Sequence, residues 1–76
     1  MFYTVLEIQS ISGTKSCIPV IYSDDDYNGD AKPWAMGKYH EILYYAAVST
    51  IEYHGALIVD NNGTVIAEEH YDRRGV

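Results

Sequence analysis

Cysteine, basic residues and long apolar runs are all scarce in this chain of 76 residues. Cys17 is the only cysteine, which excludes an internal disulfide and the cysteine pairs of a structural zinc site. No apolar run approaches the roughly 20 residues that cross a bilayer, so we expect no membrane span. Residues 1–10 lack the basic start of a secretory signal, and this favours a cytoplasmic protein.

Positive charge is the second shortage. Five Lys and Arg stand against 11 Asp and Glu, giving a formal net charge of −6 and a sequence pI near 4.7. Such a balance excludes binding of extended nucleic acid through a basic face. It still allows a small anionic ligand in a locally positive pocket, or an acidic surface that meets a basic partner.

The length predicts one domain spanning residues 1–76. A domain this small buries a modest fraction of its surface, and it lacks a disulfide or zinc site to compensate. Association with copies of itself therefore becomes the expected source of extra stability. The chain also has eight tyrosines against one Phe and one Trp. Tyrosine is common both at interfaces and in strands, so its abundance fits either location.

Two strands and a turn are predicted at the start of the chain. Residues 2–9 alternate as a strand, residues 10–16 form a turn with Gly13, and residues 17–22 form the second strand of a hairpin. Pro19 has no amide hydrogen, so the second strand should lie at a sheet edge or carry a bulge. The two sides of the first strand carry Phe2, Leu6 and Ile8 and, opposite them, Tyr3, Val5 and Glu7.

A helix should follow the polar loop of residues 23–30. Asp30 stands where an N-cap belongs, Pro33 is tolerated in a first turn, and the pattern continues to about Ser49. One apolar stripe at helical spacing should pack on the sheet; it comprises Ala35, Tyr39, Ile42, Leu43 and Ala46.

The opposite side of this helix carries a second stripe of Met36, His40, Tyr44 and Ala47. A helix that is apolar on two faces is usually buried on two faces. Because one sheet cannot cover both, we infer that a second subunit covers this stripe and that the protein is a homo-oligomer. The alternative is an exposed surface that merely tolerates apolar residues.

Residues 54–60 and 64–71 are predicted as two further strands, joined at residues 61–63 by an Asn-Gly hairpin signal. A three-residue loop with a left-handed Gly63 would pair Val59 with Val65 and Leu57 with Ala67, and would set His54 opposite His70. A two-residue loop would shift this register by one residue, so the register stays open. The predicted fold is α+β, in the order β-β-α-β-β, with a four-stranded, mostly antiparallel sheet and one helix on one face.

Signatures of catalysis are missing. Cys17 lies inside a predicted strand, no serine stands in a G-x-S-x-G turn, and no glycine-rich loop could hold a phosphate. We therefore predict no catalytic residues, no cofactor and no enzyme activity. The three histidines have no metal-ligand spacing, and no metal is predicted. Residues 24–29 match the start of a calcium loop, but Ala35 replaces its chelating glutamate, so calcium is left open.

Two surfaces are candidates for binding. Lys32 and Lys38 flank Trp34 near the helix start, where the helix dipole also favours anions. An oligomer could gather these groups into a pocket for a small nucleotide-like anion, with aromatic rings for stacking. The expected ligand and interface residues are Trp34, Met36, Lys38, His40, Tyr44 and Ala47, with Lys32, Arg73 and Arg74 as further anion contacts. The alternative is an acidic surface for a protein partner, formed by Asp24, Asp25, Asp26 and Asp30.

The second half of the chain resembles a group of short uncharacterised proteins encoded by phages and prophages of gut bacteria. The resemblance covers about residues 31–73. It rests on residues 39–41 (YHE), residues 46–50 (AAVST), Asp60 with Gly63, and Glu69 with Tyr71. No functional residue is carried over from it.

This resemblance implies a setting in the cytoplasm of a bacterial host. Small phage proteins of this kind often act against host defence, and two routes fit the surfaces above. One is sequestration of a small nucleotide-like signal between subunits. The other is inhibition of a host defence protein through an acidic surface. A phage accessory or structural role remains as a further alternative.

Overall fold

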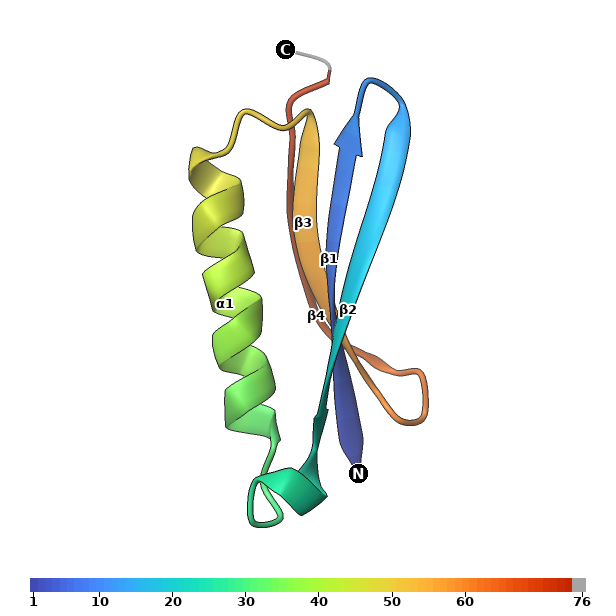
Figure 1. Cartoon of the computed structure of the whole chain (residues 1–76), viewed down its shortest axis with the longest axis vertical. Coiled ribbons are helices and arrows are strands. Elements are labelled where there is room, and N and C mark those ends of the chain that lie inside the picture. The colour runs from blue at the N-terminus through green and yellow to red at the C-terminus, as the bar shows by residue number, and fades with distance from the viewer. Residues whose placement is uncertain (75–76) are drawn as a thin grey trace.

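The computed structural model describes residues 1–74 and confirms the α+β class and the predicted order of elements. Four antiparallel strands form one sheet in the order β2-β1-β3-β4, and a single α-helix covers one side of it (Figure 1). The elements are β1 (Phe2–Ile11), β2 (Thr14–Ser23), a 3-10 turn η1 (Asp24–Asp26), α1 (Lys32–Val48), β3 (Tyr53–Asp60) and β4 (Val65–Asp72). No helix within residues 1–74 is long and apolar enough to cross a membrane.

The first hairpin is tighter than the sequence suggested. Its turn consists of Ser12 and Gly13 alone, with φ angles of 51° and 82°, so the strands extend further towards the turn than residues 9 and 17. Two successive positive φ angles match the right-handed twist of the flanking strands. β2 lies at the edge of the sheet, as Pro19 predicts.

The second hairpin begins in the predicted register and then departs from it. Val59 pairs with Val65, and Gly63 has a φ of 81°, as expected for a three-residue loop. Asp60 Oδ1 accepts hydrogen bonds from the backbone amides of Asn62 (2.8 Å) and Thr64 (3.0 Å), which hold the loop.

An irregularity in the ladder next to Val59 then shifts the pairing by one residue. Leu57 pairs with Glu68 and His54 with Tyr71, which is the register of the two-residue loop. The ladder therefore follows one of the two registers left open by the sequence on each side of the irregularity. Both Ile66 and Ala67 pack against the core. In a regular strand, two neighbouring side chains point to opposite faces. The irregularity leaves Ile66 without a partner in the ladder, and this allows both side chains to contact the core.

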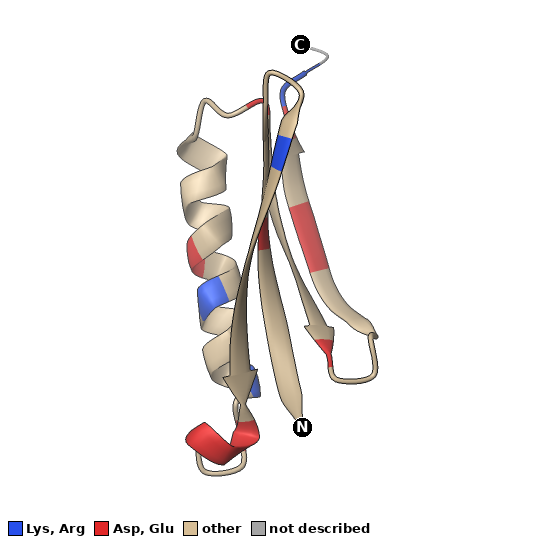
Figure 2. Cartoon of the chain, turned by 45° about the vertical axis from the view of Figure 1, so that its right-hand side comes forward, with Lys and Arg blue, Asp and Glu red and all other residues tan. Residues whose placement is uncertain are grey.

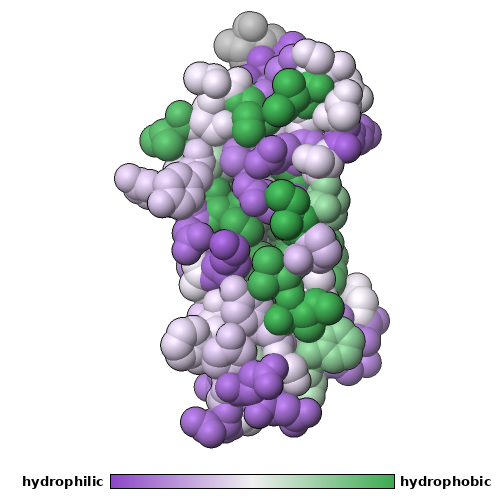
Figure 3. Space-filling model, viewed as in Figure 1, coloured by the Kyte–Doolittle hydropathy of each residue, from purple (hydrophilic) through white to green (hydrophobic). Residues whose placement is uncertain are grey.

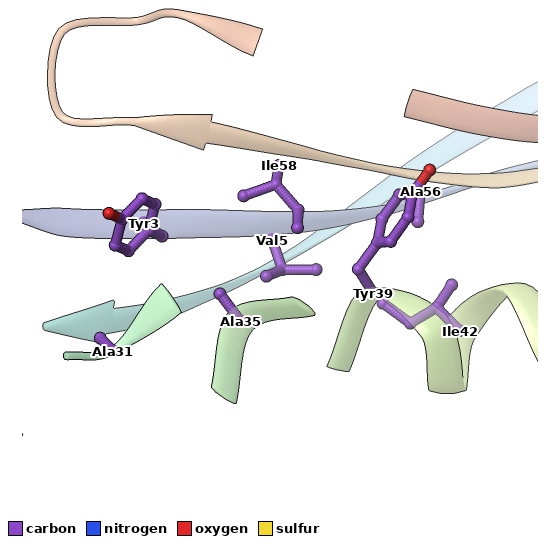
Figure 4. Packing of buried hydrophobic residues seen from close by; sticks show 8 residues of the cluster. All are labelled: Tyr3, Val5, Ala31, Ala35, Tyr39, Ile42, Ala56 and Ile58. Carbon is purple, nitrogen blue, oxygen red and sulfur yellow. The ribbon is translucent and has the colours of Figure 1, made fainter. Parts of the chain in front are cut away.

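The core lies between α1 and the two central strands. Val5 of β1 and Ile58 of β3 point towards the helix and are the largest fully buried side chains (Figure 4). Small residues in the helix allow it to approach the sheet closely, and Ala35 and Ala46 are completely buried. The predicted helical stripe is confirmed: Tyr39 and Ile42 are buried too, and Leu43 packs against the cluster.

Each end of α1 is held by a group that the sequence did not reveal. The residue before the helix is Ala31, so Asp30 is not the N-cap and that prediction was wrong. Asp24 Oδ1 accepts a hydrogen bond from the Ala31 amide instead, at 2.8 Å. At the other end, the Arg73 guanidinium donates to the carbonyl oxygens of Ala46 (2.7 Å) and Ile51 (3.1 Å). A cation at a helix C-terminus also interacts favourably with the helix dipole.

Gly55 provides a test of this packing. A Cβ atom built at residue 55 would lie 2.5 Å from His70 Cβ and 2.7 Å from the Glu69 carbonyl oxygen. We expect Gly55→Ala to lower the free energy of unfolding by about 1–3 kcal/mol, since backbone atoms must move. Gly37→Ala is the matched control: nothing lies within 4 Å there, and alanine in an exposed helix should stabilise by about 0.5–1 kcal/mol. Urea denaturation measures both, and an unchanged Gly55→Ala stability would contradict the close approach.

Candidate ligand pocket on the open face of the sheet

The side of the sheet that turns away from α1 is called the open face. Tyr3 and Val5 of β1 point to the helix, so the alternating residues and their cross-strand partners point the other way. The partners form four rows across the strands. They are Ile21–Thr4–Val59–Val65, Pro19–Leu6–Leu57–Glu68, Cys17–Ile8–Gly55–His70 and Lys15–Ser10–Tyr53–Asp72.

A pocket of about 300 Å³ lies at the end of the open face that carries the fourth row. It is lined by Ile8, Ser10, Lys15, Tyr53 and Arg74. Strand pairing brings Lys15, Ser10 and Tyr53 together from three strands, and β4 positions Arg74 beside them. The pocket therefore depends on all four strands rather than on one local motif.

Tyr53 is the centre of an aromatic stack in this region. The His70 ring lies parallel to it, with centroids 5.0 Å apart and an angle of 17° between the ring planes. The Arg74 guanidinium carbon lies 5.0 Å from the Tyr53 centroid, a cation–π distance. Gly55 stands between Tyr53 and Leu57 on this face, and its missing side chain gives β4 room to approach at His70. The Tyr53 ring is thus held in place before any ligand arrives.

The charges of the pocket are arranged around Arg74. Its Nε and Nη2 atoms donate to the two carboxylate oxygens of Asp72 at 3.0 and 2.8 Å. These hydrogen bonds hold the pKa of the Asp72 carboxyl well below its usual range and raise the pKa of the Arg74 guanidinium. Lys15 forms no ion pair within residues 1–74. The pocket therefore has a positive excess in a chain whose net charge is −6.

These groups suit a planar anion. Tyr53 lines the pocket with an aromatic ring, Lys15 and Arg74 offer positive charge, and the Ser10 hydroxyl can donate or accept a hydrogen bond. Among the described residues, no three His, Cys, Asp or Glu side chains lie close enough together to bind a metal ion.

The aromatic residues predicted on the helix are placed outside this pocket. Trp34 is 60% exposed and stacks on Tyr27 with centroids 5.0 Å apart, while Tyr44 is 67% exposed and meets Tyr45 edge to face. Met36 packs partly against the core. His40 and Ala47 are exposed, and the His40 ring meets Tyr39 edge to face.

The cations predicted as anion contacts are separated within one chain. Lys32 is the first residue of α1, and Arg73 binds carbonyl groups at the last turn, about 20 Å away for a helix of this length. Lys38 Nζ bonds Glu41 Oε1 at 3.0 Å, and this contact raises the pKa of the lysine. Arg74 is the single member of the predicted set that lines the pocket.

The four aspartates predicted as an acidic surface lie at the opposite end of the molecule from the pocket. Asp25, Asp26 and Asp30 are exposed there, whereas Asp24 is occupied by the Ala31 amide. Figure 2 shows this acidic turn in red at one end of the long axis, and blue near the end of the described chain at the other.

One buried polar cluster lies on the helix side of the sheet. His54 is 4% exposed, and its Nε2 lies 2.7 Å from Glu7 Oε2 and 3.4 Å from Gln9 Nε2. His54 Nδ1 has no hydrogen-bond partner, the single such buried side-chain atom within residues 1–74. His54 pairs with Tyr71, and His70 pairs with Gly55. His54 and His70 therefore lie on opposite faces of the sheet.

Lys15, Ser10 and Tyr53 were missed as binding residues by sequence reasoning. Lys15 fell in a predicted turn, and Tyr53 lay just before a predicted strand. Alternation in β1 does place Ser10 on the same side as Ile8, but this signal does not indicate which side the helix leaves open.

Comparisons with known proteins give no further guide to this site. No family model, curated protein or solved structure matches the chain.

The pairing of Asp72 with Arg74 predicts a pH effect. A carboxyl whose folded-state pKa is depressed adds stability above its unfolded pKa of about 3.9, and this contribution is lost as the pH falls through the lower folded value. An NMR titration of Asp72 should therefore have a midpoint well below 3.9. Arg74→Gln should return it towards that value, and Lys38→Gln should leave it unchanged. A wild-type midpoint near 3.9 would contradict the pairing.

Proposed function

We propose that this protein is a non-enzymatic binding protein that captures a small anionic ligand with a planar ring, of the nucleotide-like class. The observation that carries the proposal is the pocket lined by Lys15, Arg74 and Tyr53, in which the guanidinium lies over the tyrosine ring. A ring-bearing anion satisfies both features, whereas a purely apolar ligand would leave the cations unused.

The geometry supports a ligand of modest size. A volume of about 300 Å³ is at the lower end of small-molecule sites. One carboxylate, Asp72, lies beside the pocket and is engaged by Arg74, so a bound anion competes with it for the guanidinium. Affinity should consequently depend most on Lys15, which has no such competitor.

The resemblance to phage and prophage proteins suggests a purpose for such binding. In this proposal the protein acts in the cytoplasm of a bacterial host and removes a small nucleotide-like signal used in defence. Capture without turnover requires neither catalytic residues nor a cofactor, and stoichiometric binding is sufficient for it.

Binding can be measured by calorimetry with adenosine monophosphate, adenosine and inorganic phosphate as probes. We expect the monophosphate to bind most tightly, since it alone combines ring and charge. Lys15→Ala should lower its affinity by about 5–10-fold, as one ion contact at a surface pocket is worth about 1 kcal/mol. Tyr53→Ala should lower affinity for the monophosphate but not for phosphate. Asp72→Asn should raise affinity for both anions, because it frees the guanidinium.

Lys38→Ala is the control for these variants, since Lys38 carries the same charge on α1 and faces Glu41. An equal loss in Lys38→Ala and Lys15→Ala would place binding elsewhere. Absence of binding by the wild-type protein to every ring-bearing monophosphate tested would reject the proposed function.

The acidic turn supports a second candidate function, inhibition of a basic host protein. Asp25, Asp26 and Asp30 are exposed together, and no basic side chain forms an ion pair with them within residues 1–74. Such a surface steers a positively charged partner.

The triple variant Asp25→Asn, Asp26→Asn, Asp30→Asn tests this candidate while keeping Asp24, which holds the helix start. If an acidic surface inhibits a host protein, this variant should lose that partner in a pull-down, and binding by the wild type should weaken with salt. Replacement of Glu68 and Glu69 by Gln is the matched control on β4. Equal recovery of the partner by wild type and triple variant would exclude the acidic surface.

A further inference from the structure

Most residues of the open face are apolar, and no element within residues 1–74 covers them. Three of its four rows consist of apolar or small residues apart from Glu68 and His70 on β4. Ile21 is 64% exposed, Val65 52% and Phe2 43%. Figure 3 views the molecule with the helix and the sheet side by side; hydrophobic side chains gather there over the strands, above the hydrophilic acidic turn.

The rest of the molecule makes such exposure costly. The core beneath the helix consists of eight buried residues, three of them alanines, so it is small for a domain of this length. Chains of this size need additional burial, a disulfide or a metal to be stable. A specific protein contact needs roughly 800 Å² of surface from each partner. The molecule measures 43 Å by 21 Å along its two longest axes, so only a broad face such as the open face is large enough.

We propose that a second copy of this chain packs against the open face, sheet to sheet, with the strands of the two copies antiparallel. A two-fold axis between the Leu6 and Ile8 rows generates this dimer. The part of the proposal in which the second copy closes the ligand pocket rests on the proposed function; the dimer itself does not.

The charges of the two ends select this orientation. Lys15 and Arg74 line the pocket at one end of the sheet, with Asp72 as one carboxylate beside them. The three acidic residues of η1 are drawn in red at the other end of the long axis (Figure 2). An antiparallel pair brings the basic end of each copy to the acidic end of its partner. A parallel pair would place like charges together, which opposes association.

The rows of the open face are complementary to themselves under this symmetry. An axis that runs across the strands places β2 over β2 and β4 over β4. The Leu6 row then faces the Ile8 row of the second copy, which brings Glu68 of each copy to His70 of the other. Pro19 similarly faces Cys17, and the row of Ile21 faces the row of Lys15.

The second copy would complete the pocket. The end of the sheet that carries Phe2, Ile21 and Val65 lies over the row of Lys15, Ser10 and Tyr53, and so covers the pocket. A ligand between the copies then has an aromatic floor and an apolar roof, with the cations at its side. The dimer binds two ligands, one at each end.

The outer side of α1 is the competing interface, and it is less suitable. The Lys38–Glu41 ion pair and His40 interrupt its apolar residues. On the open face, the charged residues lie on the outer strands β2 and β4, and the central strands carry Leu6, Ile8 and Leu57 without a charge. A face whose centre carries no charge loses less hydration on contact.

Sedimentation equilibrium of three matched variants tests the interface without ligand. Ile21→Lys places a positive charge on the open face opposite Lys15 of the second copy and should raise the dimer dissociation constant at least about 100-fold, because each dimer holds this like-charge pair twice. Ile18→Lys, 51% exposed on the same strand but on the helix side, and Tyr44→Lys on α1 should leave it within about threefold. Circular dichroism checks that all three fold.

The orientation is tested by cross-linking in a Cys17→Ser background. Proteins carrying Lys15→Cys or Ile21→Cys are mixed and treated with a short bismaleimide. The antiparallel dimer should give the mixed product in excess over either self-product. Equal products, or a preference for self-products, would overturn the antiparallel arrangement.

Three outcomes separate the two proposals. A wild-type protein that stays monomeric at millimolar concentration overturns the dimer, as does dissociation by Tyr44→Lys but not Ile21→Lys. A dimer that fails to bind any ring-bearing monophosphate rejects the ligand while the dimer stands. If ligand binding weakens together with the dimer in Ile21→Lys, but not in Ile18→Lys, closure of the pocket by the second copy is supported.

Discussion

The apolar character of both sides of β1 is the constraint on which this structure depends. Val5 and Tyr3 meet the helix, while Leu6 and Ile8 on alternate positions point the other way. A single helix of 17 residues can cover one side of a four-stranded sheet and no more. The other side of the sheet, the open face, therefore keeps apolar residues that no helix covers. The proposed pocket and the proposed dimer both lie on this face.

Most of the fold could be predicted because its signals are local. Alternation gave β1, Asn-Gly marked the second hairpin, and the spacing of Ala35, Tyr39 and Ile42 gave the buried side of α1. The errors arose where distant groups decide the outcome. Asp24 rather than Asp30 binds at the helix start because η1 brings its carboxylate back, and the bulge at Ile66 follows from core packing rather than from the turn.

The candidate site was much harder to predict than the fold. Its residues are contributed by β1, β2 and β3 and by Arg74 after β4, and only strand order brings them together. Sequence reasoning placed the cations near Trp34, where the helix dipole gives a local argument. It identified Arg74 as an anion contact but had no means to join it to Lys15 or Tyr53. The sequence also did not indicate which side of the sheet stays uncovered. Alternation assigns residues to two sides but does not show on which side the helix packs.

Pro19 has a consequence for how copies of this chain meet in a crowded cell. The two-residue turn makes Ile11 and Thr14 a hydrogen-bonded pair, and alternation along the ladder makes Leu6 and Pro19 a non-hydrogen-bonded one. The nitrogen of Pro19 thus faces the free edge of β2, in the middle of the row of donors that another strand would need. A neighbouring chain cannot extend the sheet along this edge, so runaway strand addition of the kind that forms fibrils is blocked on that side.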